Sequence, residues 1–151
     1  MCKELEKQAE FYGIPIVDFE FPSAIRSAYH NGVIGINKEI GNDAERRCII
    51  VREIGRHLLR KNENISLTDE QESILAMHWA VSVLLPLKAF VECNQLGKIS
   101  EDELAEYLNI TPQFVKSGIE VYKSVLGNRI LYQNYIIDLE NRKIEYLQEV
   151  G

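Results

Sequence analysis

The order of hydrophobic and polar residues predicts helices in the middle of the chain. Between residues 44 and 60, apolar residues recur every three or four positions, which is the period of a helix with one buried face. Asn42-Asp43 stands directly before this stretch and can cap its first turn. A second helical stretch starts at Thr68 or Asp69 and runs to Pro86, where the proline either ends the helix or bends it.

Strands are expected on both sides of these helices. Ile16, Phe19 and Phe21 alternate with acidic residues, and Asn31-Gly32 separates two short runs in the way that is typical of a hairpin turn. Residues 129–137 and 143–147 are rich in aromatic and β-branched side chains. We therefore expect a small antiparallel sheet near the N-terminus and a C-terminal β-hairpin.

Shorter helices complete the pattern. Good helix formers fill residues 3–12, Ser100 and Glu103 form a capping box for a helix over 101–108, and Thr111-Pro112 opens a helix that reaches Gly127. Together these elements predict an α+β fold with about five helices. A chain of 151 residues can bury one core, and we expect a single domain over 1–151.

Composition restricts the partners and the compartment. The net charge of −6 repels phosphate backbones and anionic membranes, so nucleic acid is an unlikely partner and no membrane is expected. We see no run of about 20 apolar residues that would span a bilayer. Cys2, Cys48 and Cys93 are spaced too widely for a disulfide framework or a paired-cysteine zinc site. These features favour a cytoplasmic protein with free thiols.

Four ionisable side chains share one face of the central helix. With about 100° of rotation per residue, Arg52, Glu53, Arg56 and His57 lie within roughly 140° of each other. The simplest interpretation is a solvated face with weak ion pairs three and four residues apart. This face carries chemistry only if it lines a cleft.

A family resemblance bears on that question. The segment CIIVREIGRHLL resembles the zinc-binding helix of the ImmA/IrrE metallopeptidases, where an apolar run precedes HELGHHLL or a close variant. The segment ILAMHWAVSVLLP resembles the second helix of that family, with Ala76, Trp79-Ala80 and Leu84-Leu85-Pro86 at the matching positions. The flanking elements also match, so the resemblance covers nearly the whole chain and implies a zincin-like helical core.

The matching positions lack the zinc ligands of the family. The HExxH motif reads Arg52-Glu53-Ile54-Gly55-Arg56, and a guanidinium cannot ligate a metal. The third ligand of the family, a glutamate, matches Ser73, or Glu72 if the register shifts by one residue. The resemblance implies zinc in active relatives, but we expect no metal and no other cofactor here. Glu53 keeps the general-base position as a vestige. The chain resembles a metalloendopeptidase, but we expect the chain itself to be inactive.

Three uses of this face stay open. Arg52 and Arg56 can replace the dication by holding Glu53 and either Glu72 or Glu70 in a partly buried ion-pair cluster. The same cleft, with His57, Glu72 and Ser73, can bind a partner or an anion such as a phosphate or a terminal carboxylate. His57 and His78, with neighbouring glutamates, can also be considered as substitute metal ligands, although a lone histidine is more often a surface or core residue.

The resemblance also implies a biological role. Such relatives are commonly encoded in prophages and mobile elements and inactivate a helix-turn-helix repressor. Without zinc ligands, we expect a silent homologue that binds a repressor-like protein partner and acts as an antirepressor. One alternative is an active zinc endopeptidase that cleaves such a repressor. Another is a DNA-binding regulator that uses residues 100–126, although the acidic side chains of 101–106 would be repelled by DNA.

Overall fold

The computed structural model describes residues 7, 9–10, 12–21, 25–61 and 66–148. The expected α+β class is confirmed, with helices α2 to α6 and two three-stranded sheets in the described residues. The helix expected over 3–12 falls largely outside them. The chain forms two compact units, 1–80 and 81–151.

The N-terminal unit contains a small mixed sheet. Its strands are β1 (Ile16–Phe19), β2 (Ser27–His30) and β3 (Val33–Asn37), in the order β1-β3-β2. The expected hairpin joins β2 to β3, and Asn31 and Gly32 both have positive φ, as its tight turn requires. The sheet is not antiparallel throughout, because β1 pairs with the far side of β3 in the parallel direction.

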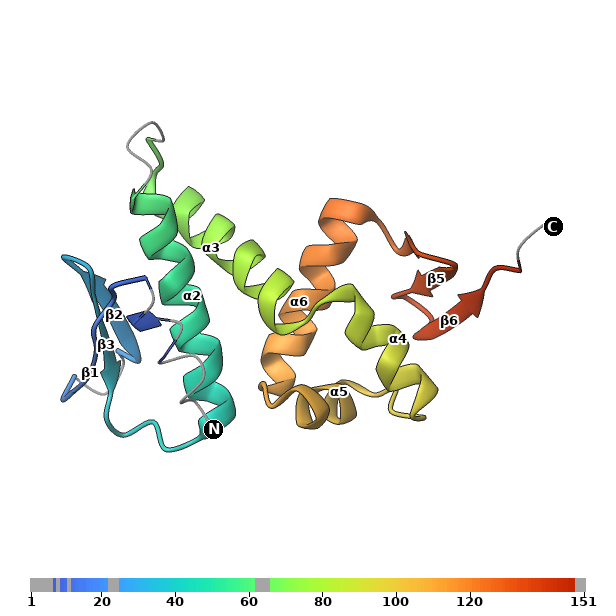
Figure 1. Cartoon of the computed structure of the whole chain (residues 1–151), viewed down its shortest axis with the longest axis horizontal. Coiled ribbons are helices and arrows are strands. Elements are labelled where there is room, and N and C mark those ends of the chain that lie inside the picture. The colour runs from blue at the N-terminus through green and yellow to red at the C-terminus, as the bar shows by residue number, and fades with distance from the viewer. Residues whose placement is uncertain (1–6, 8, 11, 22–24, 62–65, 149–151) are drawn as a thin grey trace. The chain divides into compact units, whose positions relative to one another are not determined.

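Helix α2 (Asp43–Lys61) packs beside this sheet (Figure 1). The Asn42 side chain accepts a hydrogen bond of 3.1 Å from the amide of Glu45, so the expected N-cap is confirmed. Apolar side chains of the helix are buried, including Ile50, Val51 and Ile54. Removing their apolar surface from water is the main stabilising contribution of this contact.

Helix α3 (Asp69–Leu84) follows, and its start is also capped as expected. The Thr68 hydroxyl accepts from the amide of Gln71, and the Gln71 side chain accepts from the amide of Thr68. The helix approaches α2 closely at Gly55. A Cβ atom added to Gly55 would lie 3.2 Å from the backbone oxygen of Ala76 and 3.2 Å from a ring carbon of Trp79.

We therefore expect Gly55→Ala to lower the free energy of unfolding by about 1 kcal/mol. Alanine is about 1 kcal/mol better than glycine in a helix interior, but overpacking costs about 1–3 kcal/mol. Urea denaturation with an unchanged m value measures the loss. A smaller loss is expected for Gly118→Ala, where the nearest atom is a terminal methyl group of Leu85 at 2.7 Å that can rotate away. A larger loss of stability for Gly118→Ala than for Gly55→Ala would show that the backbone contact at Gly55 is not the cause.

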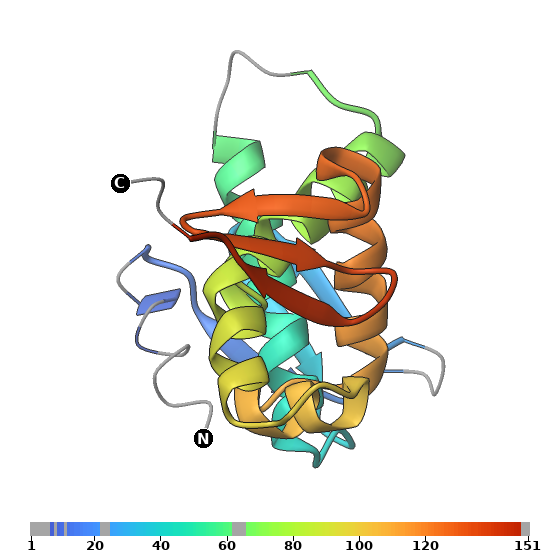
Figure 2. The ribbon, with the colours of Figure 1, turned by 90° about the vertical axis from the view of Figure 1, so that its right-hand side faces the viewer.

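The C-terminal unit combines helices with a second sheet. Its helices are α4 (Leu87–Gln95), α5 (Glu101–Leu108) and α6 (Pro112–Leu126), and the expected caps at Ser100 and Thr111 are confirmed. The strands β4 (Arg129–Tyr132), β5 (Tyr135–Asp138) and β6 (Lys143–Tyr146) lie side by side in that order (Figure 2). Three strands replace the expected hairpin because Gln133, at a φ of 53°, turns the chain within the first stretch.

Residues Asp69–Gln95 are long and apolar enough to cross a membrane by length and composition, so the expectation that no such run is present was wrong. The core helix of a soluble protein passes the same test. The stretch is divided at Pro86, where α3 has ended and α4 begins. Several of its apolar residues are buried, among them Ala80, Leu84 and Leu85.

Candidate functional site

A charged cluster joins α2 to α3 within the N-terminal unit. Arg60 binds Glu72 with two hydrogen bonds, one from Nε and one from Nη2, each 2.9 Å long. Glu72 is only 8% exposed. The hydrogen bonds from Arg60 hold the pKa of the Glu72 carboxyl below its ordinary value. This buried carboxylate is therefore ionised and paired at neutral pH.

Arg56 occupies the centre of the cluster. Its guanidinium lies 3.5 Å from a carboxylate oxygen of Glu53 and 3.5 Å from one of Glu72. Its Nη2 donates a hydrogen bond of 2.9 Å to the hydroxyl of Ser73. Both residues that match the third ligand of the family, Ser73 and Glu72, therefore contact the same arginine.

Glu53 is the least satisfied member of the cluster. It is 7% exposed, and its Oε1 lies 3.3 Å from the Ser27 hydroxyl, which donates to it. Burial raises the pKa of Glu53 above its ordinary value, more than the neighbouring arginines lower it. Within the described part of the chain, Glu53 Oε2 and Arg56 Nε are buried without a hydrogen-bond partner. A solvated face therefore does not describe this side of α2.

His57 belongs to a separate contact beside the cluster. Its Nδ1 lies 2.6 Å from the hydroxyl of Tyr29 on β2, and the two rings meet edge to face. Burial lowers the pKa of His57, so the ring is neutral at neutral pH. The guanidinium carbon of Arg60 lies 5.0 Å from the centre of the Tyr29 ring.

The structure changes the expected membership of the ion-pair cluster. Arg60, rather than Arg52, is the second arginine that holds Glu72, and Glu70 is exposed. Arg60 could have been found from its spacing, because Arg52, Arg56 and Arg60 recur every four residues along one helix face. Ser27 and Tyr29 had no signal in the sequence, since only the packing of β2 against α2 brings them here.

A polar pocket of about 220 Å³ opens beside the cluster. Arginines 52, 56 and 60 line it together with Glu53, and β2 contributes Ser27 and Tyr29. Arg52 faces this pocket, and no described carboxylate lies within 4 Å of its guanidinium. The pocket is the part of the site that could receive a ligand.

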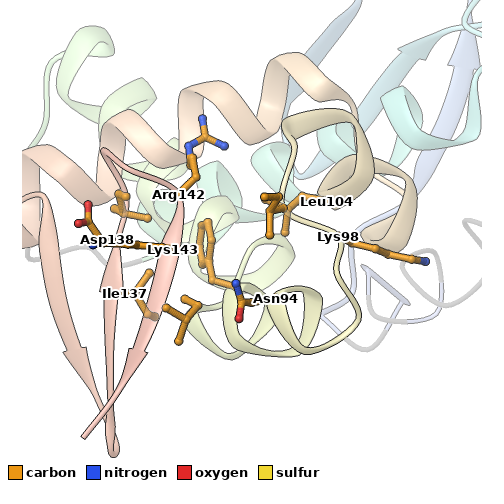
Figure 3. A pocket seen from close by; sticks show the side chains of 11 residues that line it. Asn94, Lys98, Leu104, Ile137, Asp138, Arg142 and Lys143 are labelled. Carbon is orange, nitrogen blue, oxygen red and sulfur yellow. The ribbon is translucent and has the colours of Figure 1, made fainter.

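A smaller cavity in the C-terminal unit lies between α4 and the strands β5 and β6 (Figure 3). Phe90, Leu104 and Ile137 line it with the basic side chains of Lys98 and Arg142. Its volume of about 20 Å³ holds at most a water molecule or two. This cavity is a packing defect of the core rather than a ligand site.

The charged cluster involves α2, the helix that matches the zinc-binding helix of the family. Together with the fold, this position defines a metallopeptidase-like protein. A family model described as the IrrE N-terminal-like domain of Peptidase_M78 matches residues 9–120. The chain belongs to this family, and the resemblance to the ImmA/IrrE proteins is confirmed.

Other comparisons cover less of the chain. Two S-adenosylmethionine synthases, from Bradyrhizobium sp. strains ORS 278 and BTAi1, are each 28% identical to it over 65 residues. The matched region is 40% of this chain and 16% of each synthase, so the chain spans a small part of the length of these relatives. No solved structure matches the chain.

The residues at the family's zinc position do not fit a zinc ion. Zinc is bound in proteins by cysteine, histidine and carboxylate ligands, usually in a tetrahedron. Here a guanidinium stands between Glu53, Glu72 and Ser73, and a permanently protonated group repels a dication. Among the described residues, no group of three or more His, Cys, Asp or Glu side chains is placed to hold a metal ion. His57 and His78 belong to no such group among these residues.

Proposed function

We propose that this chain is a catalytically silent member of its family that binds a repressor-like protein partner in the cytoplasm. The observation that carries the proposal is the position of Arg56, whose guanidinium bridges Glu53, Glu72 and Ser73. A fixed positive charge substitutes there for the dication of an active relative. The peptidase-like scaffold is thus kept without a hydrolytic centre.

The role of the partner follows from the family. Members encoded by phages and mobile elements inactivate helix-turn-helix repressors, and a protein that keeps the scaffold but cannot hydrolyse a peptide bond can still sequester one. This makes the chain an antirepressor that regulates transcription by binding. Exposed acidic residues on α5, Asp102 and Glu106, disfavour direct contact with DNA phosphates as the mechanism.

We expect the purified protein to contain no stoichiometric zinc. It is produced without a metal-binding tag, dialysed against a mild chelator and analysed for metal. Its zinc content should equal that of Glu53→Ala and fall far below one ion per chain, because arginine supplies no ligand. Near-stoichiometric zinc would overturn the proposal and favour an active endopeptidase.

The partner is tested in a second measurement. The protein is mixed with the helix-turn-helix repressor encoded beside its gene, and the complex is sought by size-exclusion chromatography. Mass spectrometry of the recovered repressor then distinguishes the two mechanisms. An intact repressor in a stable complex supports sequestration. A cleaved repressor indicates an active peptidase, and the absence of a complex removes the proposed partner.

A further inference from the structure

The polar pocket beside the cluster carries an excess of positive charge. Three arginines contribute to the charged group around it, and two carboxylates, Glu53 and Glu72, oppose them. Arg60 and Arg56 are paired with these carboxylates, whereas Arg52 has no carboxylate within 4 Å among the described side chains. With both carboxylates ionised, this charged group beside the pocket has a net charge of about +1, which complements a single negative charge.

Two buried polar atoms are unpaired next to this charge. Glu53 is more than nine-tenths buried and lines the pocket, and its Oε2 has no hydrogen-bond donor in the described structure. The Arg56 Nε is buried in the same place and lies 3.5 Å from Glu53 Oε1 without forming a hydrogen bond. Leaving such groups unpaired costs about 1–3 kcal/mol each, so a ligand that supplies both a donor and an acceptor gains this energy on binding.

The arrangement selects among oxyanions. A carboxylate is planar, singly charged and matches the fork of a guanidinium. A phosphate carries more charge at neutral pH and would lie against the buried Glu53. At the end of a peptide, the last residue presents a carboxylate together with its own backbone N–H. That N–H is the donor that Glu53 lacks.

We propose that the pocket formed by Arg52, Arg56 and Glu53 binds the C-terminal carboxylate of a peptide chain. The inference rests on the proposed function, because it requires that no metal occupies the cluster. Arg52 and the Nε–H of Arg56, which forms no hydrogen bond in the described structure, bind the carboxylate, and Glu53 accepts from the last backbone N–H. The site thus recognises the C-terminus of a peptide without cleaving the peptide.

The experiment uses the wild-type protein and three short peptides. NMR titrations follow the backbone amides of α2 and β2 and the Nε–H groups of arginines. Acetyl-trialanine with a free carboxylate should shift these signals in a saturable way. The same peptide with a C-terminal amide should bind at least about tenfold more weakly, because it loses a charge-assisted hydrogen-bond pair. An amidated peptide with one internal aspartate tests whether any carboxylate suffices.

Each outcome decides the proposal. Equal binding of the free and amidated peptides, equal binding of the internal aspartate peptide, or no saturable shift would overturn it. Inorganic phosphate, titrated in parallel, should bind more weakly than the free peptide, and tighter phosphate binding would also overturn it. Zinc analysis of the same sample distinguishes failure of this inference from failure of the proposed function. Zinc-free protein that does not bind the peptide contradicts only this inference. Stoichiometric zinc contradicts the proposed function.

Variants of Arg52 test whether this side chain binds the carboxylate of the peptide. Arg52→Gln should weaken the free peptide by at least about tenfold and leave the amidated peptide unchanged. Arg47→Gln is the matched control, because this arginine is on the same helix and does not line the pocket. Arg52→Lys keeps the charge without the planar fork and should lie between wild type and Arg52→Gln. If all three variants bind alike, Arg52 does not hold the carboxylate.

Discussion

The triple variant Arg52→His, Arg56→His and Ser73→Glu is expected to bind about one zinc ion per chain, whereas the wild type is expected to bind none. The first two positions are separated by one helical turn and face the same side of α2, as two zinc-binding histidines must. Ser73 lies within hydrogen-bonding distance of the Arg56 guanidinium, so a glutamate there reaches the same point. Metal analysis after dialysis measures the effect directly.

A second readout is thermal stability. A ligand that binds only the folded state stabilises it, so zinc should raise the melting temperature of the triple variant and leave that of the wild type unchanged. The matched control carries histidines at Arg47 and Arg56 with the same Ser73→Glu change. Its two histidines are too far apart along α2 to share one ion. Equal zinc in the control and the triple variant would refute the assignment of ligand positions.

Local sequence patterns were sufficient for the helix caps and for the first hairpin turn. The caps at Asn42, Thr68, Ser100 and Thr111 each place a side-chain oxygen where the first turn of a helix has unpaired amides, and all four are observed. The Asn31-Gly32 turn was likewise readable, because few residues adopt its positive φ angles. Signals of this kind depend on near neighbours in the chain.

Pairings between strands that are distant in the sequence could not be predicted from such local patterns. Nothing in Ile16–Phe19 indicates that it pairs in parallel with β3, because a strand of this length fits either edge of a hairpin. The turn at Gln133 also lacks the usual Asn-Gly or Asp-Gly sequence, so the third C-terminal strand was missed.

In the candidate site, too, residues of one helix could be grouped from the sequence, but the contacts between helices could not be predicted. The helix wheel brought Arg52, Glu53 and Arg56 together, and the resemblance added Glu72 and Ser73 from α3. Which arginine holds Glu72 depends on the exact distance between two helices, which spacing alone does not give. Arg60 reaches it with two hydrogen bonds, while Arg52, two turns earlier, faces the open pocket.

Glu72→Gln is expected to destabilise the fold by about 1–3 kcal/mol near neutral pH. The amide keeps the size of the side chain but removes the charge that Arg60 and Arg56 share. Loss of one partner of a buried ion pair costs up to about 3–5 kcal/mol. The cost is smaller here because the Arg60 side chain is 43% exposed and water can solvate it. Urea denaturation of both proteins measures the difference.

The pH dependence gives the same prediction a sharper test. The pKa of Glu72 is lowered in the folded state, so its ionised form contributes stability above the unfolded pKa of about 4.3 and loses it as the pH falls through the folded pKa. The stability gap between wild type and Glu72→Gln should therefore narrow as the pH is lowered below about 4. A gap that stays constant with pH would mean that packing, and not charge, is responsible.

Glu53→Gln is the matched control, with the opposite sign expected. Burial raises the pKa of Glu53, so the folded state favours its neutral form, and the stability that this provides is present below the unfolded pKa and lost as the pH rises through the folded one. A neutral amide should therefore cost little near neutral pH or stabilise the fold. If both variants destabilise equally, the cluster is an ion-pair network in which each carboxylate is needed. If only Glu72→Gln does, Glu53 is retained at a cost to stability, as a group kept to meet a ligand.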